Sequence, residues 1–242
     1  NFSKVGSRDD YTVALLKDNY IESTMNGCPA WYNFDYFTKR IQNNLKINKI
    51  LISVPGSELF FDQFISLLIY LKNLNRFEIN VSFNHGITIE KYKRLYNKIK
   101  NLSVVIHDMS GNTSNSKIYD EMDLHIGYRV HSNIYFLSHR KPSILIIEDS
   151  RGKGVVETLG GVGILGYKYP TRLKYFVNRV FNKFSKTKKI RFGWEKDVIP
   201  FVTDELQLLL SGKFEKFNRI YEKIEETYYN NMKPFVKSIV KE

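Results

Sequence analysis

The sequence predicts an α/β protein built on a doubly wound parallel sheet, followed by a helical C-terminal tail. Between residues 50 and 159, five short runs of β-branched and apolar residues alternate with segments of helical apolar spacing. Such alternation is typical of βαβ crossovers, which produce parallel sheets. After Gly166 the strand signals end, and the chain becomes helical and aromatic. With 242 residues, 43% of them apolar, the chain is long enough to bury a sizeable core.

The elements follow one another in a simple order. Ser7 is expected to open a helix with acidic residues in its first turn that runs to about Asp18, and residues 26–29 form a turn. The expected strands are 50–54, 77–83, 102–107, 124–127 and 143–147. The expected helices are 62–74, 88–99 with Thr88 as cap, 116–122, 130–137, 154–159, and in the tail 173–184 and about 213–236.

Cysteine and histidine usage excludes most metal sites. Cys28 is the single cysteine, so intrachain disulfides and multi-cysteine metal sites are excluded, and a reducing, cytoplasmic location is expected. The five histidines include no His-x-x-x-His pair. We therefore expect neither a metal centre nor a cofactor. No uncharged apolar run is long enough to span a membrane.

The net charge of +12 is concentrated in one segment. Nine basic residues lie between residues 168 and 191, a stretch without any acidic residue. The apolar side chains of 173–184 recur on one face of a helix, a pattern typical of helices at anionic membrane surfaces. The apolar face of 169–191 is expected to pack on the sheet, and peripheral contact of this segment with the inner face of a membrane is the alternative. No helix-turn-helix, RNP-like or zinc pattern is present, so nucleic acid is not expected as a partner.

Two strand-to-helix junctions carry residues suited to an anionic ligand. In open parallel sheets ligands bind at the carboxyl ends of the strands, where helix N-termini direct N–H groups at anions. The first junction, 123–132, contains Gly127, Arg129 and His131. The second, 148–154, places Arg151 and Lys153 between glycines ahead of a helix. Both junctions favour an anion.

In their order and spacing, these residues resemble the polysaccharide pyruvyl transferases. The family pattern is an Asp, a short strand, and Arg-apolar-His-Ser at the start of a helix, followed by a Pro-led strand. The matching residues here are Asp123, Arg129-Val130-His131-Ser132, Lys141-Pro142, Lys153-Gly154, Arg8-x-x-Tyr11-Thr12 and the Gly-Cys-Pro-Ala turn at 27–30. The resemblance covers about residues 5–165 and is more specific than any single motif.

The resemblance implies a Rossmann-like half of a two-Rossmann-domain (GT-B-like) architecture. It divides the chain into the end of an N-terminal Rossmann-like domain (1–34), a donor-binding domain (35–200) and a helical tail (201–242). It implies transfer of a pyruvyl group from phosphoenolpyruvate, as a cyclic ketal, onto sugar hydroxyls of a glycan or lipid-linked glycan. Since one side of the cleft is then missing, we expect this chain alone to bind phosphoenolpyruvate weakly and to be inactive.

The resemblance also implies roles for individual residues. Arg129 and the helix N-terminus would bind the phosphate and carboxylate of the donor, together with Ser132, Lys153, Gly154 and Arg8. Ketal formation needs a general acid, for which His131 is the candidate. A role for His131 as an imidazolium that holds the phosphate stays open.

Other interpretations of the same residues remain. A nucleotide-sugar glycosyltransferase of the two-Rossmann-domain type would bind a diphosphate at these junctions and a ribose with Glu148. A non-enzymatic basic anion-binding protein is the second alternative. Glu148 and Asp149 could instead be solvated acids, His125 is expected to be a core imidazole, and His139 a partner of a helix C-terminus.

Overall fold

The computed structural model describes residues 5–84, 89–109, 113–168 and 196–240. The helix expected at 173–184 and the basic segment 169–191 lie outside the described residues. None of the helices within the described ranges is long and apolar enough to cross a membrane.

Six parallel strands form the central sheet, in the order β5-β4-β3-β6-β7-β8. Their bounds are β3 Lys49–Ser53, β4 Glu78–Asn84, β5 Val105–Met109, β6 Leu124–Gly127, β7 Ser143–Ile147 and β8 Gly163–Leu165. Numbered along the chain from β3, this is the 3-2-1-4-5-6 order of the Rossmann fold, in which the direction of winding reverses between β3 and β6. The five expected strands are confirmed. The sixth, β8, was not expected, because three residues that include a glycine give no strand signal.

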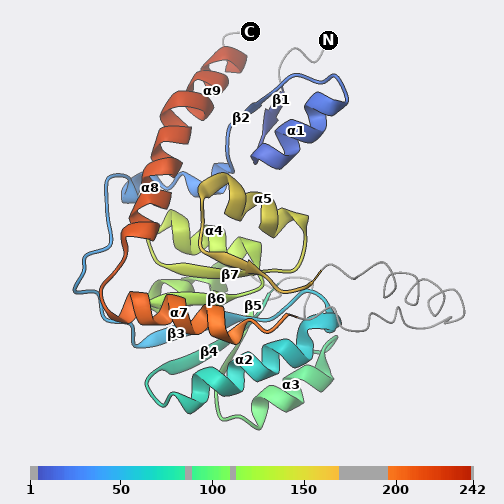
Figure 1. Cartoon of the computed structure of the whole chain (residues 1–242), viewed down its shortest axis with the longest axis vertical. Coiled ribbons are helices and arrows are strands. Elements are labelled where there is room, and N and C mark those ends of the chain that lie inside the picture. The colour runs from blue at the N-terminus through green and yellow to red at the C-terminus, as the bar shows by residue number, and fades with distance from the viewer. Residues whose placement is uncertain (1–4, 85–88, 110–112, 169–195, 241–242) are drawn as a thin grey trace, which may run out of the picture.

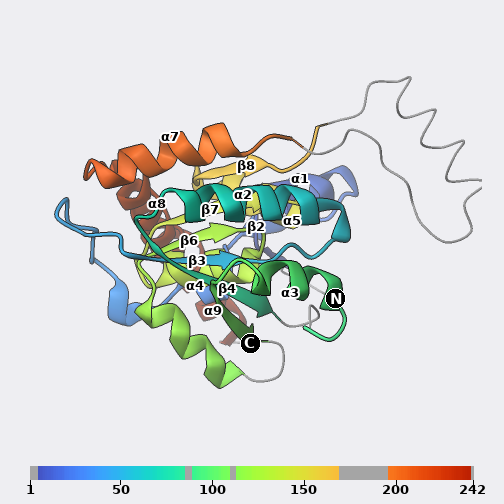
Figure 2. The ribbon, with the colours of Figure 1, turned by 90° about the horizontal axis from the view of Figure 1, so that it is seen from below.

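Helices cover both faces of this sheet (Figures 1 and 2). Figure 1 shows α2 (Phe61–Asn73), α3 (Lys93–Lys100) and α7 (Ile199–Leu210) on one side and α4 (Val130–Ser138) with α5 (Ser150–Leu159) on the other. A 3₁₀ helix, Thr113–Glu121, joins β5 to β6. The prediction of a Rossmann-like, doubly wound parallel sheet, as found in each half of the GT-B architecture, is therefore confirmed.

Helices α3 and α5 begin elsewhere than the sequence predicts. Helix α3 begins at Lys93 rather than at 88, and Thr88 lies outside the described residues. Helix α5 begins at Ser150, because the side chain of Asp149 accepts the N–H groups of Arg151 and Gly152 as an N-cap. Arg151 and Lys153 therefore lie in the first turn of a helix and not in a glycine-rich loop.

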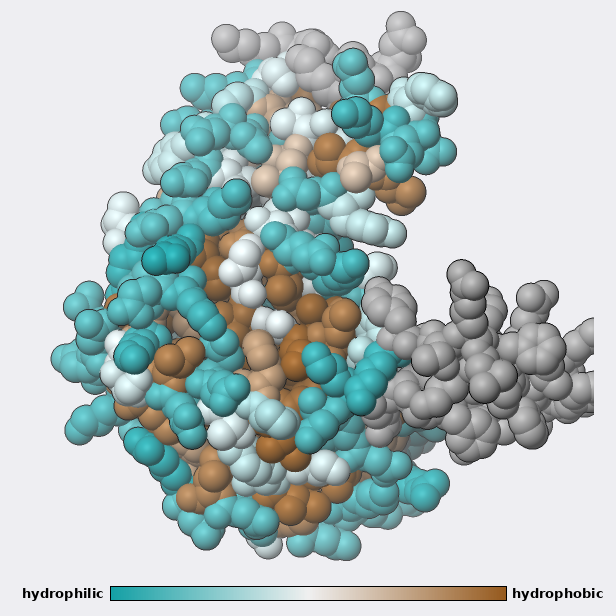
Figure 3. All heavy atoms as spheres, viewed as in Figure 1, coloured by the Kyte–Doolittle hydropathy of each residue, from teal (hydrophilic) through white to brown (hydrophobic). Residues whose placement is uncertain are grey.

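A small unit precedes the sheet. Strands β1 (Val5–Ser7) and β2 (Ser23–Met25) pair in parallel, and α1 (Asp10–Asp18) connects them. The cap of α1 is Asp9 rather than the expected Ser7, since the Asp9 carboxylate accepts the Thr12 N–H at 2.8 Å. Asp10 N–H donates to Thr158 Oγ1 at 2.9 Å, which joins α1 to α5. Figure 3 shows apolar side chains among hydrophilic ones over this upper unit, where Leu15 and Ile21 are exposed.

The helical tail returns to that unit, as Figure 1 shows. Helix α8 (Glu215–Thr227), a π-helical turn (Tyr228–Met232) and α9 (Lys233–Val240) follow one another without a break. This confirms the long helix expected from about 213 to 236 and extends it. Asn231 Nδ2 donates to the Met25 carbonyl at 2.6 Å, so the end of the tail is held against β2.

Candidate functional site

The site is built where β3 and β6 lie side by side, at the point where the winding reverses. A Cβ at Gly127 would lie 2.4 Å from Ser53 Oγ and 2.7 Å from Ser53 N, so only glycine allows this close approach of the two strands. Ser53 Oγ then accepts the backbone N–H of Arg129 at 3.0 Å. Ser53, the last residue of β3, thereby holds the backbone of Arg129, two residues after the end of β6.

A buried histidine supports the same contact. His125 Nε2 lies 2.9 Å from Ser53 Oγ, and its Nδ1 lies 2.8 Å from Ser143 Oγ. Complete burial lowers the pKa of His125 to about 3, so the imidazole is neutral at physiological pH. The expectation that His125 is a core imidazole is confirmed.

Arg129 is the N-cap residue of α4, and its guanidinium group lies near residues that follow two other strands, β3 and β7. Its Nη1 atom and Glu148 Oε1 would lie 2.9 and 2.8 Å from a Cβ at Gly56. The Gly56 N–H donates to both carboxylate oxygens of Glu148, at 3.0 and 2.9 Å. Burial raises the pKa of Glu148, and the Gly56 hydrogen bond and the Arg129 charge offset part of that rise. Gly56, Arg129 and Glu148 follow β3, β6 and β7, and they meet at one edge of the sheet.

The charges of three guanidinium groups act on His131, the second residue of α4. His131 is exposed, and partial loss of hydration lowers its pKa, as do the charges of Arg129, Arg151 and Arg8. The imidazole is therefore neutral at physiological pH and lies in a positive field. This field, together with the N–H groups at the start of α4, is suited to a ligand with more than one negative charge.

Arg8 reaches the site from the end of β1. Its Nε donates to Asp9 Oδ2 at 3.2 Å, and its side chain is 35% exposed. Arg8 and His131 line the same pocket, which has a volume of about 620 Å³ and continues between α4 and the turn at 28–35. Arg8 and His131, which the sequence placed in one site, thus lie together in the structure. The charges of Arg129 and of Arg151, from the second junction, also act on His131.

Three other residues assigned to donor binding by resemblance have different surroundings. Ser132 Oγ is fully buried and lies 3.0 Å from the Tyr119 hydroxyl. Lys153 Nζ pairs with Glu157 Oε1 at 3.7 Å, one turn further along α5. A Cβ at Gly154 would lie 2.9 Å from the Asp9 carboxyl carbon, so Gly154 permits α1 to pack on α5. For these three residues a role in donor binding stays a prediction.

The remaining candidates have structural partners. Asp149 caps α5 and pairs with Arg151 at 2.6 Å. His139 Nδ1 lies 2.8 Å from the Tyr135 carbonyl in the last turn of α4, as expected for a partner of a helix C-terminus. Cys28 is half-buried in the wall of the pocket. Within the described ranges, no three His, Cys, Asp or Glu side chains are grouped so that they could hold a metal ion.

The pairing of Gly56 with Glu148 was not predicted. The two residues are 92 positions apart, and only the order of the strands places them together. The glycine that follows β3 by three residues, in a Pro-Gly-Ser sequence, was the available signal.

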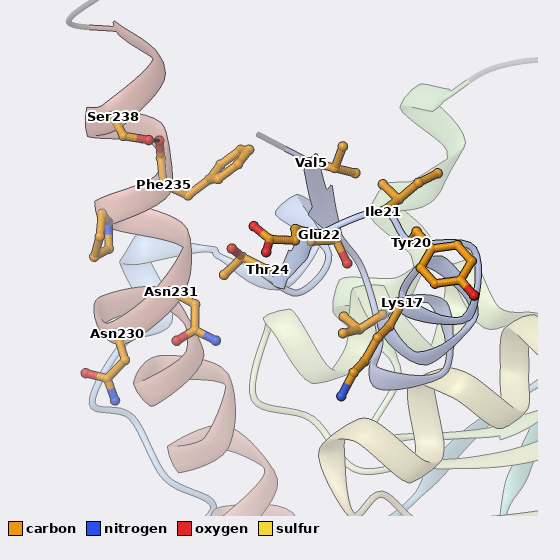
Figure 4. A pocket seen from close by; sticks show the side chains of 13 residues that line it. Val5, Lys17, Tyr20, Ile21, Glu22, Thr24, Asn230, Asn231, Phe235 and Ser238 are labelled. Carbon is orange, nitrogen blue, oxygen red and sulfur yellow. Dashed lines mark hydrogen bonds between the residues drawn. The ribbon is translucent and has the colours of Figure 1, made fainter. Parts of the chain in front are cut away.

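A second, larger pocket of about 860 Å³ lies between the β1–β2 unit and the tail. Figure 4 shows Asn231 and Phe235 of the tail on one side of it and Thr24 and Lys17 on the other. Among the described residues that line it, Lys17 is the one cation. Because the charges of three guanidinium groups act on His131 at the start of α4 instead, the site at α4 is the better candidate for an anionic ligand.

Comparisons with known proteins agree with the resemblance seen in the sequence. The model of one protein family, described as polysaccharide pyruvyl transferase, matches residues 1–150. The solved structures that are similar include a mutant of the S. aureus protein TarM in complex with fondaparinux, alpha-GlcNAc-glycerol and UDP. The TM-score is 0.46 with 12% identity, over 94% of this chain and 43% of that one.

A glycosyltransferase from Rickettsia africae ESF-5 is also similar, with a TM-score of 0.42 and 16% identity over 94% of this chain and 63% of that one. The chain therefore spans less than two thirds of either solved protein. No curated protein matches the sequence.

Proposed function

The chain belongs to the polysaccharide pyruvyl transferase family, and from this we propose that it takes part in the transfer of a pyruvyl group from phosphoenolpyruvate to a glycan. The family points to a transferase that modifies polysaccharide. The finer assignment, phosphoenolpyruvate as donor and a cyclic ketal as product, is supported by one observation above all. The charges of Arg8, Arg129 and Arg151 all act on His131 at the start of α4, and Arg8 lines the same pocket as His131.

The charge of the donor fits this arrangement. Phosphoenolpyruvate carries a phosphate and a carboxylate on adjacent positions of a three-carbon unit. Planar guanidinium groups bind both kinds of anion through paired hydrogen bonds. Arg129 and Arg8, which belong to different elements, can each take one of the two groups, while the N–H groups of α4 contribute oriented dipoles.

The proposed reaction forms two carbon–oxygen bonds and breaks one. A proton adds to the methylene carbon, one sugar hydroxyl adds to the neighbouring carbon, and a second hydroxyl then replaces the phosphate. Of the two hydroxyl protons, one is balanced by the proton on the new methyl group, and the other leaves with inorganic phosphate. His131 is the proposed proton donor. Although its pKa is lowered in the free protein, a bound trianionic donor favours the imidazolium through its own charge.

The glycosyltransferase alternative has less support from this geometry. In that alternative Glu148 would bind a ribose hydroxyl, whereas in this structure its half-buried carboxylate accepts the Gly56 N–H and lies beside Arg129. The alternative of a basic anion-binding protein without catalysis depends on the basic residues of 169–191. This segment lies outside the described residues.

The proposal includes the domain organisation. Residues 1–34 contain the β1–α1–β2 unit, and a parallel βαβ unit is what the end of a Rossmann-like domain would contribute. Residues 35–200 would form the donor-binding domain and 201–242 the tail. A cytoplasmic location, and contact of 169–191 with the inner face of a membrane, stay predictions.

Binding measurements on this chain test the donor. Phosphoenolpyruvate and UDP are titrated separately into the protein, and the ³¹P line width of each ligand is followed. We expect broadening of the phosphoenolpyruvate signal that is lost in Arg8→Ala and Arg129→Ala. Broadening of UDP alone, with phosphoenolpyruvate unaffected, would favour the glycosyltransferase alternative and overturn the proposal.

A further inference from the structure

The 620 Å³ pocket extends well beyond the cationic residues. It begins at Arg8 and His131 and continues along the outer face of α4 to Ser138 and His139. Its volume lies within the range of about 300–1,000 Å³ that small-molecule sites occupy. Phosphoenolpyruvate, a three-carbon unit with one phosphate, needs only the cationic end, so a second ligand can occupy the rest.

The walls of this extension combine flat aromatic faces with polar edges. The rings of Tyr135 and His139 are stacked, with centroids 4.0 Å apart and planes 13° from parallel. Across the pocket Phe34 is 58% exposed, and its ring is held edge-on by Tyr228 at 4.9 Å. Asn33 and Asp35, on either side of Phe34, also line the pocket.

The polar groups keep these walls in place. Asn33 Nδ2 lies 3.2 Å from His139 Nε2, so the turn at 28–35 is tied to the end of α4 across the pocket. Asn33 Oδ1 also accepts the Asp35 N–H at 3.3 Å. A site that is already formed loses less entropy when a ligand binds.

We propose that this extension of the pocket binds the acceptor, a hexopyranose ring of the glycan, beside the donor. A pyranose presents apolar C–H faces that can lie on aromatic rings and hydroxyl edges that can bond to amide and carboxylate oxygens. The inference rests on the proposed function, since it assigns the second substrate of the same reaction.

The position of the pocket suits the reaction. A cyclic ketal requires two hydroxyls of one ring to reach the same carbon of the donor, and reacting atoms must come within about 3–3.5 Å. A ring that rests between Phe34 and Tyr135 directs one edge at Arg8 and His131, where the donor is held. The opposite edge points along α4 toward Asn33 and His139, whose polar atoms can bond to ring hydroxyls.

Saturation-transfer NMR with methyl glucoside, galactoside and mannoside, in the absence of phosphoenolpyruvate, tests the acceptor site. We expect at least one of these sugars to receive saturation from the wild-type protein. Phe34→Ala removes an aromatic face, and Ala30→Trp fills the pocket from an exposed lining residue. Each should reduce the effect at least fivefold. Tyr20→Ala, which truncates a 99% exposed ring outside this pocket, is the matched control and should leave it unchanged.

The outcomes separate this inference from the proposed function. If all three sugars fail with the wild type, or if both pocket variants keep the full effect while circular dichroism shows them folded, the acceptor site is refuted. Loss of the saturation transfer in Tyr20→Ala alone would place the sugar in the second pocket, which Tyr20 lines, and would also refute the acceptor site. Phosphoenolpyruvate binding is measured separately by ³¹P line width. If the sugar binds but phosphoenolpyruvate does not, the proposed donor is contradicted and the proposed sugar site is kept.

Uridine provides the remaining test, because a nucleobase also stacks on aromatic rings. Uridine is added to the complex with the methyl glycoside that binds. We expect the saturation of the sugar to persist. Displacement of the sugar by uridine, with the saturation of uridine lost in Phe34→Ala, would assign the pocket to a nucleobase and overturn the inference.

Discussion

The backbone N–H of Gly56 donates to both carboxylate oxygens of Glu148, at 3.0 and 2.9 Å. This contact joins the loop after β3 to the end of β7, and Arg129, which follows the intervening strand β6, lies beside it. Because Arg129 Nη1 and Glu148 Oε1 both approach the position where Gly56 would carry a Cβ, the arginine can hold its place only while residue 56 has no side chain. The cationic edge of the sheet therefore depends on a glycine 73 residues earlier in the sequence.

Gly56→Ala should weaken phosphoenolpyruvate binding by about tenfold or more. The new methyl group would lie 2.8 Å from Glu148 Oε1 and 2.9 Å from Arg129 Nη1, closer than non-bonded atoms approach. Both are ends of flexible side chains, so they move aside and the fold is kept. A tenfold loss corresponds to about 1.4 kcal/mol. Calorimetric titration measures the affinity, and thermal unfolding confirms the fold.

Gly161→Ala is the matched control for this substitution. A Cβ there has Val156 Cα as its nearest neighbour at 3.5 Å, an ordinary contact. We expect unchanged affinity for phosphoenolpyruvate. Equal affinity of both variants would show that Gly56 does not position Arg129.

Arg129→Ala should weaken phosphoenolpyruvate binding about a hundredfold, whereas Lys153→Ala should change it by about twofold or less. The guanidinium is one of the charged groups around His131, and hydrogen bonds to charged groups contribute about 1.5–3 kcal/mol each. The Lys153 amine instead pairs with Glu157 at 3.7 Å. The same titration compares both variants. A large loss in Lys153→Ala would instead support the donor-binding role that the family resemblance implies for Lys153.

Local patterns predicted most of the sheet and part of the site. Strands such as Ser143–Ile147 were recognised because the run is short, fully buried and mostly β-branched or Leu. The three-residue strands β1, β2 and β8 are too short for any periodicity. They exist because neighbouring strands or helices offer them partners.

The site was predictable where sequence neighbours form it. Arg129 and His131 follow a strand and its glycine and open a helix, which is a local arrangement. The contact between Gly56 and Glu148 depends on strand order, which no local pattern fixes. The pairing of Lys153 with Glu157 was readable, since residues four apart face each other on a helix.

Phosphoenolpyruvate should bind more tightly at pH 6 than at pH 8, and His131→Gln should remove much of that dependence. Loss of hydration and three guanidinium groups lower the pKa of His131 in the free protein. A bound anion raises that pKa again, so binding takes up a proton, and affinity grows as pH falls toward the raised value. The phosphate of the ligand titrates near pH 6 as well. Because His131→Gln keeps only the pH dependence of the phosphate, the difference between the two proteins gives the contribution of His131. Identical pH profiles for both proteins would exclude His131 from the donor site.

Glu225→Gln should destabilise the protein by about 3 kcal/mol, because it breaks the contact that holds the tail on the sheet domain. Glu225, on α8, accepts hydrogen bonds from Arg40 Nη1 at 2.9 Å, from Arg140 Nη2 at 3.0 Å and from the Thr38 N–H at 2.9 Å. The side chain of Arg140 is only 3% exposed. Removing one partner of such a buried pair leaves an uncompensated charge, at a cost of about 3–5 kcal/mol.

The pH dependence of unfolding gives this last prediction its sign. Burial alone would raise the pKa of Glu225, but the hydrogen bonds from Arg40, Thr38 and Arg140 lower it. A lowered pKa contributes stability above the pKa of the unfolded chain, and that stability is lost as pH falls through the lower folded value. The difference in the free energy of unfolding in urea between wild type and Glu225→Gln should therefore shrink from pH 6 toward pH 3.

Glu222→Gln is the control variant. Glu222 lies on the same helix but is 55% exposed and 3.6 Å from Arg40, so its substitution should lower the free energy of unfolding by less than about 0.5 kcal/mol. Equal costs for the two variants would show that the contact is a solvated surface pair.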